Sequence, residues 1–145
     1  MCKSKTNMKP HQSKECHGII HGFSATAAAA GAIPLPIADA IPICAAQITM
    51  IISLGKVFGF TIGRSTAESI AGVGLAAAAG RFVFANAVKL IPVAGSIVGA
   101  VTATAITEAL GWLVADDFYR ISIGEKPEKI LKGMADARNI FRKVA

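Results

Sequence analysis

One kind of break between apolar stretches occurs twice in this chain. Residues 31–39 and 90–96 each place an Ile-Pro pair between long apolar runs, beside small or turn-forming residues. The glycine of a Leu-Gly pair lies 16 residues after Asp39 and 16 residues after Gly95, at Gly55 and Gly111. Because proline ends or kinks a helix and its neighbours favour turns, each break predicts the tip of a helical hairpin. We therefore expect one hairpin to be used twice.

The periodicity favours helices throughout. No long stretch alternates apolar and polar residues with the period of a strand, so we expect an all-α chain. Asp39 is a candidate N-cap, Gly59 a helix-closing glycine, and Ser65 and Glu68 a capping box. The expected helices cover about residues 15–32, 39–58, 65–89 and 96–119, and a fifth begins at residue 125. The predicted architecture is a four-helix body of two pseudo-repeated hairpins plus an amphipathic C-terminal helix.

Charged residues are concentrated towards the two ends of the chain. Residues 1–15 have a net charge of +3 and residues 116–145 a net charge of +2, whereas residues 16–115 hold only seven charged side chains. This pattern favours an apolar body whose basic ends face an anionic membrane surface or lipid. We divide the chain into a flexible basic segment (1–14), a helical-hairpin domain (15–120) and an amphipathic helix (125–145).

The composition points towards a membrane. The hydrophobic fraction is 53% and the mean hydropathy is +0.55, above the usual range of soluble domains. The uncharged runs at residues 40–55 and 90–107 approach the length of about 20 residues that a transmembrane helix needs. Arg81 and Lys89 argue against a third helix deep in a bilayer. Gly95 and Gly99 form a GxxxG pair that lets another helix approach closely. The alternative is a tightly packed soluble helical core.

Three polar residues in apolar surroundings form a candidate site. Asp39, Gln47 and Glu108 lie in or beside apolar helices, where each buried polar group needs a hydrogen-bond partner. They are predicted to line a small polar cluster between the hairpins. The alternative gives each a structural part: a helix cap for Asp39, an interhelical hydrogen bond for Gln47, and a surface or paired carboxylate for Glu108.

The first helix carries a candidate metal site. Cys16, His17 and His21 offer three ligands, and the two histidines are one helical turn apart. No second matching ligand pair occurs in the chain, so a structural role for these residues is the alternative. The sequence contains no phosphate-binding loop and no readable Ser/His/Asp arrangement. Its basic residues are not interleaved with aromatic residues. We therefore expect no enzyme activity, no cofactor and no nucleic-acid partner.

The last predicted helix is amphipathic. An apolar stripe recurs at helical spacing from Ile130 to Val144, and basic residues occupy the other faces. Such a helix either lies on an anionic membrane or a partner, or packs back on its own bundle. The candidate membrane or partner surface consists of Lys129, Lys132, Arg138, Arg142 and Lys143.

Short motifs between residues 16 and 120 resemble the domain of unknown function 697 family. They include His-Gly-Ile-Ile-His at residues 17–21, the proline-containing breaks, Leu-Gly-Lys-Val-Phe-Gly at 54–59 and Thr-Glu-Ala-Leu-Gly-Trp at 107–112. The resemblance implies a bacterial helical module, often attached behind a small Ras-like GTPase domain or present in inner-membrane proteins. This chain carries no GTPase domain, and the resemblance supplies no catalytic residues.

Three functional hypotheses follow. The leading one is a non-enzymatic, membrane-associated helical protein that forms homo-oligomers or recruits a partner, at the bacterial inner membrane or its cytoplasmic face. The second is a soluble, cytoplasmic interaction module that docks a separate partner such as a GTPase. The third is a metal-handling protein that uses the N-terminal cysteine and histidines.

Overall fold

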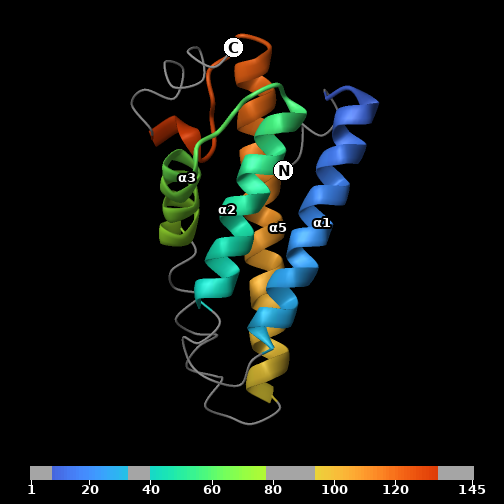
Figure 1. The fold of residues 1–145 in the computed structure, drawn as a ribbon, viewed down its shortest axis with the longest axis vertical. Helices are drawn as coiled ribbons and strands as arrows, with labels where there is room; N and C mark the ends of the chain where they lie inside the picture. Colours follow the sequence, from blue (N-terminus) through green and yellow to red (C-terminus); the bar gives the residue numbers. More distant parts are fainter. Residues whose placement is uncertain (1–7, 33–39, 78–93, 134–145) are drawn as a thin grey trace.

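The computed structural model describes residues 8–32, 40–77 and 94–133, and their regular structure is helical (Figure 1). This confirms the predicted all-α class. Four α-helices lie in these ranges, and a short 3-10 turn, η1, follows them at Leu131–Gly133. The α-helices are α1 (Pro10–Gly31), α2 (Ala40–Val57), α3 (Arg64–Ala77) and α5 (Ala94–Ser122).

The long helices form an elongated bundle. α1 runs down the molecule in Figure 1, and α2 and α5 both run up it, so α1 is antiparallel to both. α1 packs most extensively against α5 and then against α2, and α2 also contacts α3 and α5. The antiparallel contact of α1 and α2 agrees with the first predicted hairpin, whose tip at residues 33–39 lies outside the described ranges. Most of the second predicted tip, residues 90–93, also lies outside them, so the pseudo-repeat stays a prediction.

Two helices are longer than expected. α1 begins at Pro10, so residues 10–14 belong to a helix and not to a flexible segment. Proline is well suited to a first helical turn, because its missing N–H has no intrahelical partner there. α5 extends from Ala94 to Ser122, beyond both expected ends.

α2 and α5 end in the same kind of turn. Gly59 has φ +81° and Gly124 has φ +84°. The N–H of Phe60 donates to the carbonyl of Gly55 at 2.9 Å, and that of Glu125 to the carbonyl of Arg120 at 2.8 Å. These are Schellman motifs, which need the left-handed conformation that glycine adopts without strain. The predicted role of Gly59 is confirmed.

The two glycines spaced alike in the repeat both lie at close contacts. A Cβ atom on Gly111 would be 2.8 Å from Cγ1 of Ile20, so this glycine lets α5 approach α1. A Cβ atom on Gly55 would be 2.7 Å from Cγ1 of Ile62, in the connection that folds back over the end of α2. Both positions exclude a larger residue unless the facing isoleucine moves.

Two apolar clusters form the core of the described part of the chain. The larger one contains bulky side chains, among them Leu54, Phe118 and Leu131. The smaller one is formed by Ala27, Ala30, Ile43 and Ala103.

Three buried polar residues separate these clusters, one on each long helix. Ser24, Gln47 and Thr107 are each at most 2% exposed, and we call them the polar layer. Nε2 of Gln47 donates to Oγ1 of Thr107 at 3.4 Å, which joins α2 to α5. Oγ of Ser24 and Oε1 of Gln47 are buried without a hydrogen-bond partner.

Among the described residues, no helix is long and apolar enough to cross a membrane. The expectation of a transmembrane helix is therefore not supported. The longest helix, α5, has 29 residues, but its second half carries Glu108, Asp116, Asp117 and Arg120.

Candidate functional site

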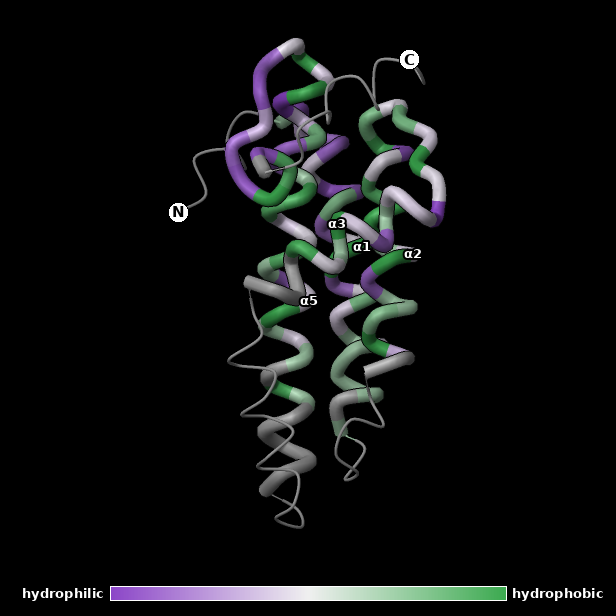
Figure 2. Tube along the Cα trace, turned by 90° about the vertical axis from the view of Figure 1, so that its left-hand side faces the viewer, coloured by the Kyte–Doolittle hydropathy of each residue, from purple (hydrophilic) through white to green (hydrophobic). Residues whose placement is uncertain are grey.

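Charged side chains are concentrated at one end of the bundle. The described residues 22–32, 40–55, 69–77 and 94–107 contain no Asp, Glu, Lys or Arg, and we call them the uncharged end. The remaining described residues hold the charges and form the charged end. Figure 2 shows hydrophilic residues gathered in the upper part of the molecule. Asp39, Arg81 and Lys89 lie outside the described residues.

The surface of the uncharged end is made of small and apolar side chains. Val101 on α5 is 64% exposed and Val73 on α3 is 42% exposed. Ala25, Ala45 and Ala105 are exposed on α1, α2 and α5. Such a surface offers water few hydrogen-bonding groups apart from scattered hydroxyls, and most of those with a hydrogen bond donate to a carbonyl of their own helix. For example, Oγ1 of Thr49 donates to the carbonyl of Ala45 at 2.9 Å.

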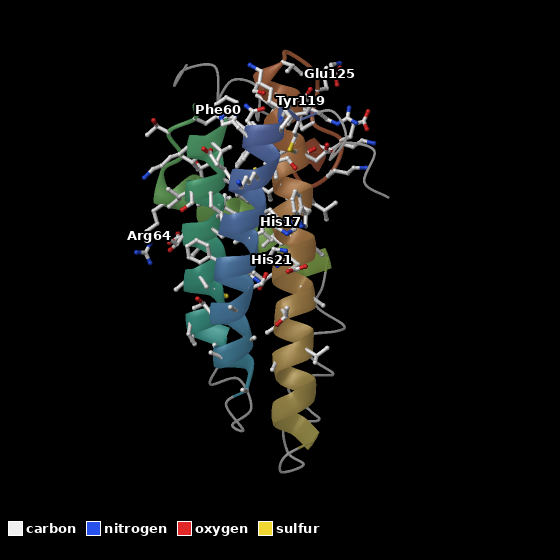
Figure 3. All side chains as sticks on the ribbon, turned by 90° about the vertical axis from the view of Figure 1, so that its right-hand side faces the viewer. His17, His21, Phe60, Arg64, Tyr119 and Glu125 are labelled. Carbon is white, nitrogen blue, oxygen red and sulfur yellow. The ribbon has the colours of Figure 1, made fainter. Side chains whose placement is uncertain are left out.

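A cluster of four side chains marks the border between the two ends, and we call it the boundary cluster. Nδ1 of His21 on α1 lies 2.6 Å from Oε1 of Glu108 on α5. The rings of His17 and His21 meet edge to face, with centroids 4.0 Å apart, and the centroid of His17 is 5.8 Å from that of Trp112. The His21 and Glu108 side chains are 48% and 33% exposed. Figure 3 shows both histidines between α1 and α5.

The predicted polar cluster of Asp39, Gln47 and Glu108 is divided by the structure. Glu108 pairs with His21 at the surface, whereas Gln47 bonds to Thr107 in the core. Asp39 lies outside the described residues. The structural alternative therefore describes Gln47 and Glu108: one makes an interhelical hydrogen bond and the other is a paired carboxylate.

The predicted metal ligands point in different directions. Cys16 is fully buried in the larger apolar cluster, whereas His17 and His21 are exposed. Burial, with a smaller contribution from the charge of Glu15, raises the pKa of the Cys16 thiol to about 11, which keeps it protonated near neutral pH. Within the described ranges, no group of three or more His, Cys, Asp or Glu residues could hold a metal ion.

At the charged end, a buried carboxylate holds the chain that follows α5. Asp117 is fully buried, and its Oδ1 accepts the backbone N–H groups of Glu128 and Lys129 at 2.8 and 2.9 Å. Its Oδ2 accepts the N–H of Leu131 at 2.8 Å. A helix was expected to begin at Glu125, but residues 125–130 are not helical and η1 follows at Leu131. The carboxylate of Asp117 accepts hydrogen bonds from backbone N–H groups that a capping residue at the start of a helix would otherwise accept.

Arg120 also contacts the segment that follows α5. Its guanidinium lies 3.4 Å from Asp116, 3.2 Å from Glu125 and 3.2 Å from Glu128. Sequence reasoning missed both Asp117 and Arg120. The available signal was an Asp-Asp pair in the last third of a helix, where the dipole disfavours negative charge and an acidic residue needs another reason to be present.

Comparison with known proteins places these features in a family. The family model described as "Domain of unknown function (DUF697)" matches residues 3–132. The chain belongs to this family. The resemblance carried by the motifs between residues 16 and 120 is thereby confirmed. The DUF697 match contains both ends of the bundle, the boundary cluster and the Asp117 contacts.

A curated relative adds a membrane context. "Magnetosome membrane protein 22" of Magnetospirillum gryphiswaldense is 31% identical over 106 residues, which is 70% of this chain and 54% of that protein. The DUF697 chain thus spans about half the length of this relative. No solved structure matches the chain.

The remaining predicted surface and packing residues are only partly placed. Lys129 and Lys132 are exposed at the charged end, and Arg138, Arg142 and Lys143 lie outside the described residues. Gly95 and Gly99 lie in the first turns of α5. A packing role for these two glycines in this DUF697 chain stays a prediction.

Proposed function

We propose that this protein is a non-enzymatic, membrane-associated helical protein that attaches through its uncharged end. The observation that carries the proposal is the division of charge across α1, α2, α3 and α5, which leaves one end of the bundle without a described charged residue. A soluble bundle would be expected to place charged side chains along the full length of its exposed faces. Here the C-terminal parts of α1 and α3 and the N-terminal parts of α2 and α5 carry no charged residue.

The energetics of a lipid environment suit this end. A charged side chain at the centre of a bilayer costs about 2.5 kcal/mol or more, and backbone groups there must be hydrogen-bonded within the protein. The uncharged end is helical in its described parts, and its exposed side chains include Val101 and Ala105. The name of the curated relative as a membrane protein adds support from an independent source.

In this orientation the charged end faces the aqueous phase, which we assign to the cytoplasmic side of the inner membrane. Its exposed lysines, such as Lys126, Lys129 and Lys132, are then available to a separate partner or a second copy. A separate GTPase or self-assembly are the two forms of recruitment that we propose.

Vesicle flotation with two matched variants tests the attachment. Val101 and Ile123 are both exposed β-branched residues on α5 or directly after it, one at each end of the bundle. Val101→Lys places a charge at the uncharged end and is expected to reduce flotation with phosphatidylcholine–phosphatidylglycerol vesicles at least tenfold. Ile123→Lys adds the same charge at the charged end and is expected to float like the wild type. Equal flotation of the two variants, or a wild type that stays with the soluble fraction, contradicts the proposal.

A further inference from the structure

We infer that the boundary cluster lies at the level of the lipid headgroups, so that the protein enters one leaflet and no further. This inference rests on the proposed attachment through the uncharged end. It adds how deep that end enters the bilayer. The occupant of the surface is a bilayer: acyl chains surround the uncharged end, and the phosphate and glycerol region surrounds His17, His21 and Trp112.

The first argument is length. At 1.5 Å per residue, α5 from Ala94 to Thr107 is about 20 Å long, and α1 from Gly22 to Gly31 is about 14 Å long. The hydrocarbon of one leaflet is about 15 Å thick, half of the full core of about 30 Å. The described uncharged end therefore reaches about as deep as one leaflet. This agrees with the finding that no described helix could cross a membrane.

The second argument is the chemistry at the border. Trp112 combines an apolar ring with a polar N–H, and such a side chain is favoured where hydrocarbon meets water. The two histidines beside it add polar ring nitrogens that can bond to water or to lipid headgroups. Trp112 is the only tryptophan of the chain. Glu108 lies at the same level, and its 2.6 Å contact with His21 gives the carboxylate a partner where water becomes scarce.

The third argument comes from a charged residue of α3 that lies near the same height. Figure 3 shows Arg64 at about the height of His17 and His21, although it belongs to α3 on another side of the bundle. Arg64 pairs with Glu68 at 2.8 Å, and α3 has no charged residue after Glu68. A guanidinium at this height suits lipid phosphates, which it binds in a bidentate manner.

The connectivity gives the topology. α1 begins and α5 ends at the charged end, and the 128–131 segment is held beside Asp117. Both ends of the described chain therefore lie on the same side of the membrane. The bundle would enter and leave the bilayer through one surface.

Trp112 is a native probe of this depth. On binding to phosphatidylcholine–phosphatidylglycerol vesicles, its emission is expected to shift to shorter wavelength. Lipids brominated near the headgroup should quench it more strongly than lipids brominated near the acyl-chain ends. Stronger quenching by the deep bromines, or no quenching by either set from a protein that floats with the vesicles, overturns the inference.

Two relocated tryptophans test the orientation in a Trp112→Phe background. Ala105→Trp places the probe seven residues earlier on an exposed position of α5, about 10 Å deeper, and should reverse the preference towards deep bromines. Ile123→Trp places it at the charged end and should escape both quenchers. Quenching of Ile123→Trp together with an unquenched Ala105→Trp means attachment by the opposite end. A wild type that does not float with the vesicles is a separate result, and it contradicts the proposed function itself.

Discussion

The two ends of the bundle are built differently although the same three long helices run through both. The charged end has two Schellman turns and a buried aspartate that holds a returning segment. The larger cluster of bulky side chains fills it and extends into the adjoining turns of α2 and α3. Deeper in the uncharged end lies the small, alanine-rich cluster, which a polar layer with two unpartnered atoms separates from the larger cluster. This contrast teaches that the larger cluster supplies most of the folding free energy in water, since buried apolar area is the main source of that free energy.

The largest difference should appear when one residue of each core cluster is truncated. Leu54→Ala in the larger cluster is expected to lower the free energy of unfolding by about 4 kcal/mol, because the side chain is fully buried among bulky neighbours. Ile43→Ala in the smaller cluster is expected to cost about 2 kcal/mol, because the alanines around it provide fewer contacts. Urea unfolding measures both values. A larger loss for Ile43→Ala would reverse the comparison.

The second-largest effect is expected at the buried Asp117. Asp117→Asn removes charge and leaves the side chain with one acceptor oxygen for three N–H groups, so we expect a loss of about 3 kcal/mol. Hydrogen exchange at the amides of Glu128 and Leu131 should accelerate in this variant.

The neighbouring Asp116 is the matched control. Its one contact among the described residues is a long one, 3.4 Å to Arg120, so Asp116→Asn should cost less than about 1 kcal/mol and leave those amides protected. Equal effects of the two substitutions would show that Asp117 has no special role in holding the segment.

A smaller effect concerns the close approach of α1 and α5. Gly111→Ala places a Cβ atom 2.8 Å from Ile20 and is expected to cost about 2 kcal/mol by overpacking. Gly22→Ala on α1 meets no atom within 4 Å and should stabilise the helix by about 0.5–1 kcal/mol. Thermal melts compare the two variants. A stabilising Gly111→Ala would mean that the helices are not in close contact at this point.

The sequence predicted what depends on local signals. A glycine directly after an apolar helix identified Gly59, and the uncharged runs identified the helices that form the uncharged end. It could not predict the partners of Asp117, because these N–H groups lie 11 to 14 residues further along and meet it only after the chain reverses at Gly124. For the same reason the pairing of His21 with Glu108 was missed. Both residues were singled out, but in different candidate sites, and only the packing of α1 on α5 joins them.

The smallest expected effect is in the polar layer. Ser24→Ala removes a buried hydroxyl that has no partner and should stabilise the protein by about 1 kcal/mol or less. Thr107→Val removes the hydroxyl that accepts from Gln47 and should destabilise the protein by about 1 kcal/mol. Paired urea titrations resolve the opposite signs. A destabilising Ser24→Ala would indicate that its hydroxyl has a partner in solution.

The measurement that tests the central claim most directly is vesicle flotation of Val101→Lys beside Ile123→Lys. If the uncharged end enters the membrane, the first variant loses binding while the second floats like the wild type, and both retain the wild-type helical content in water. If Ile123→Lys loses binding and Val101→Lys does not, the charged end is the attachment surface and the account is wrong.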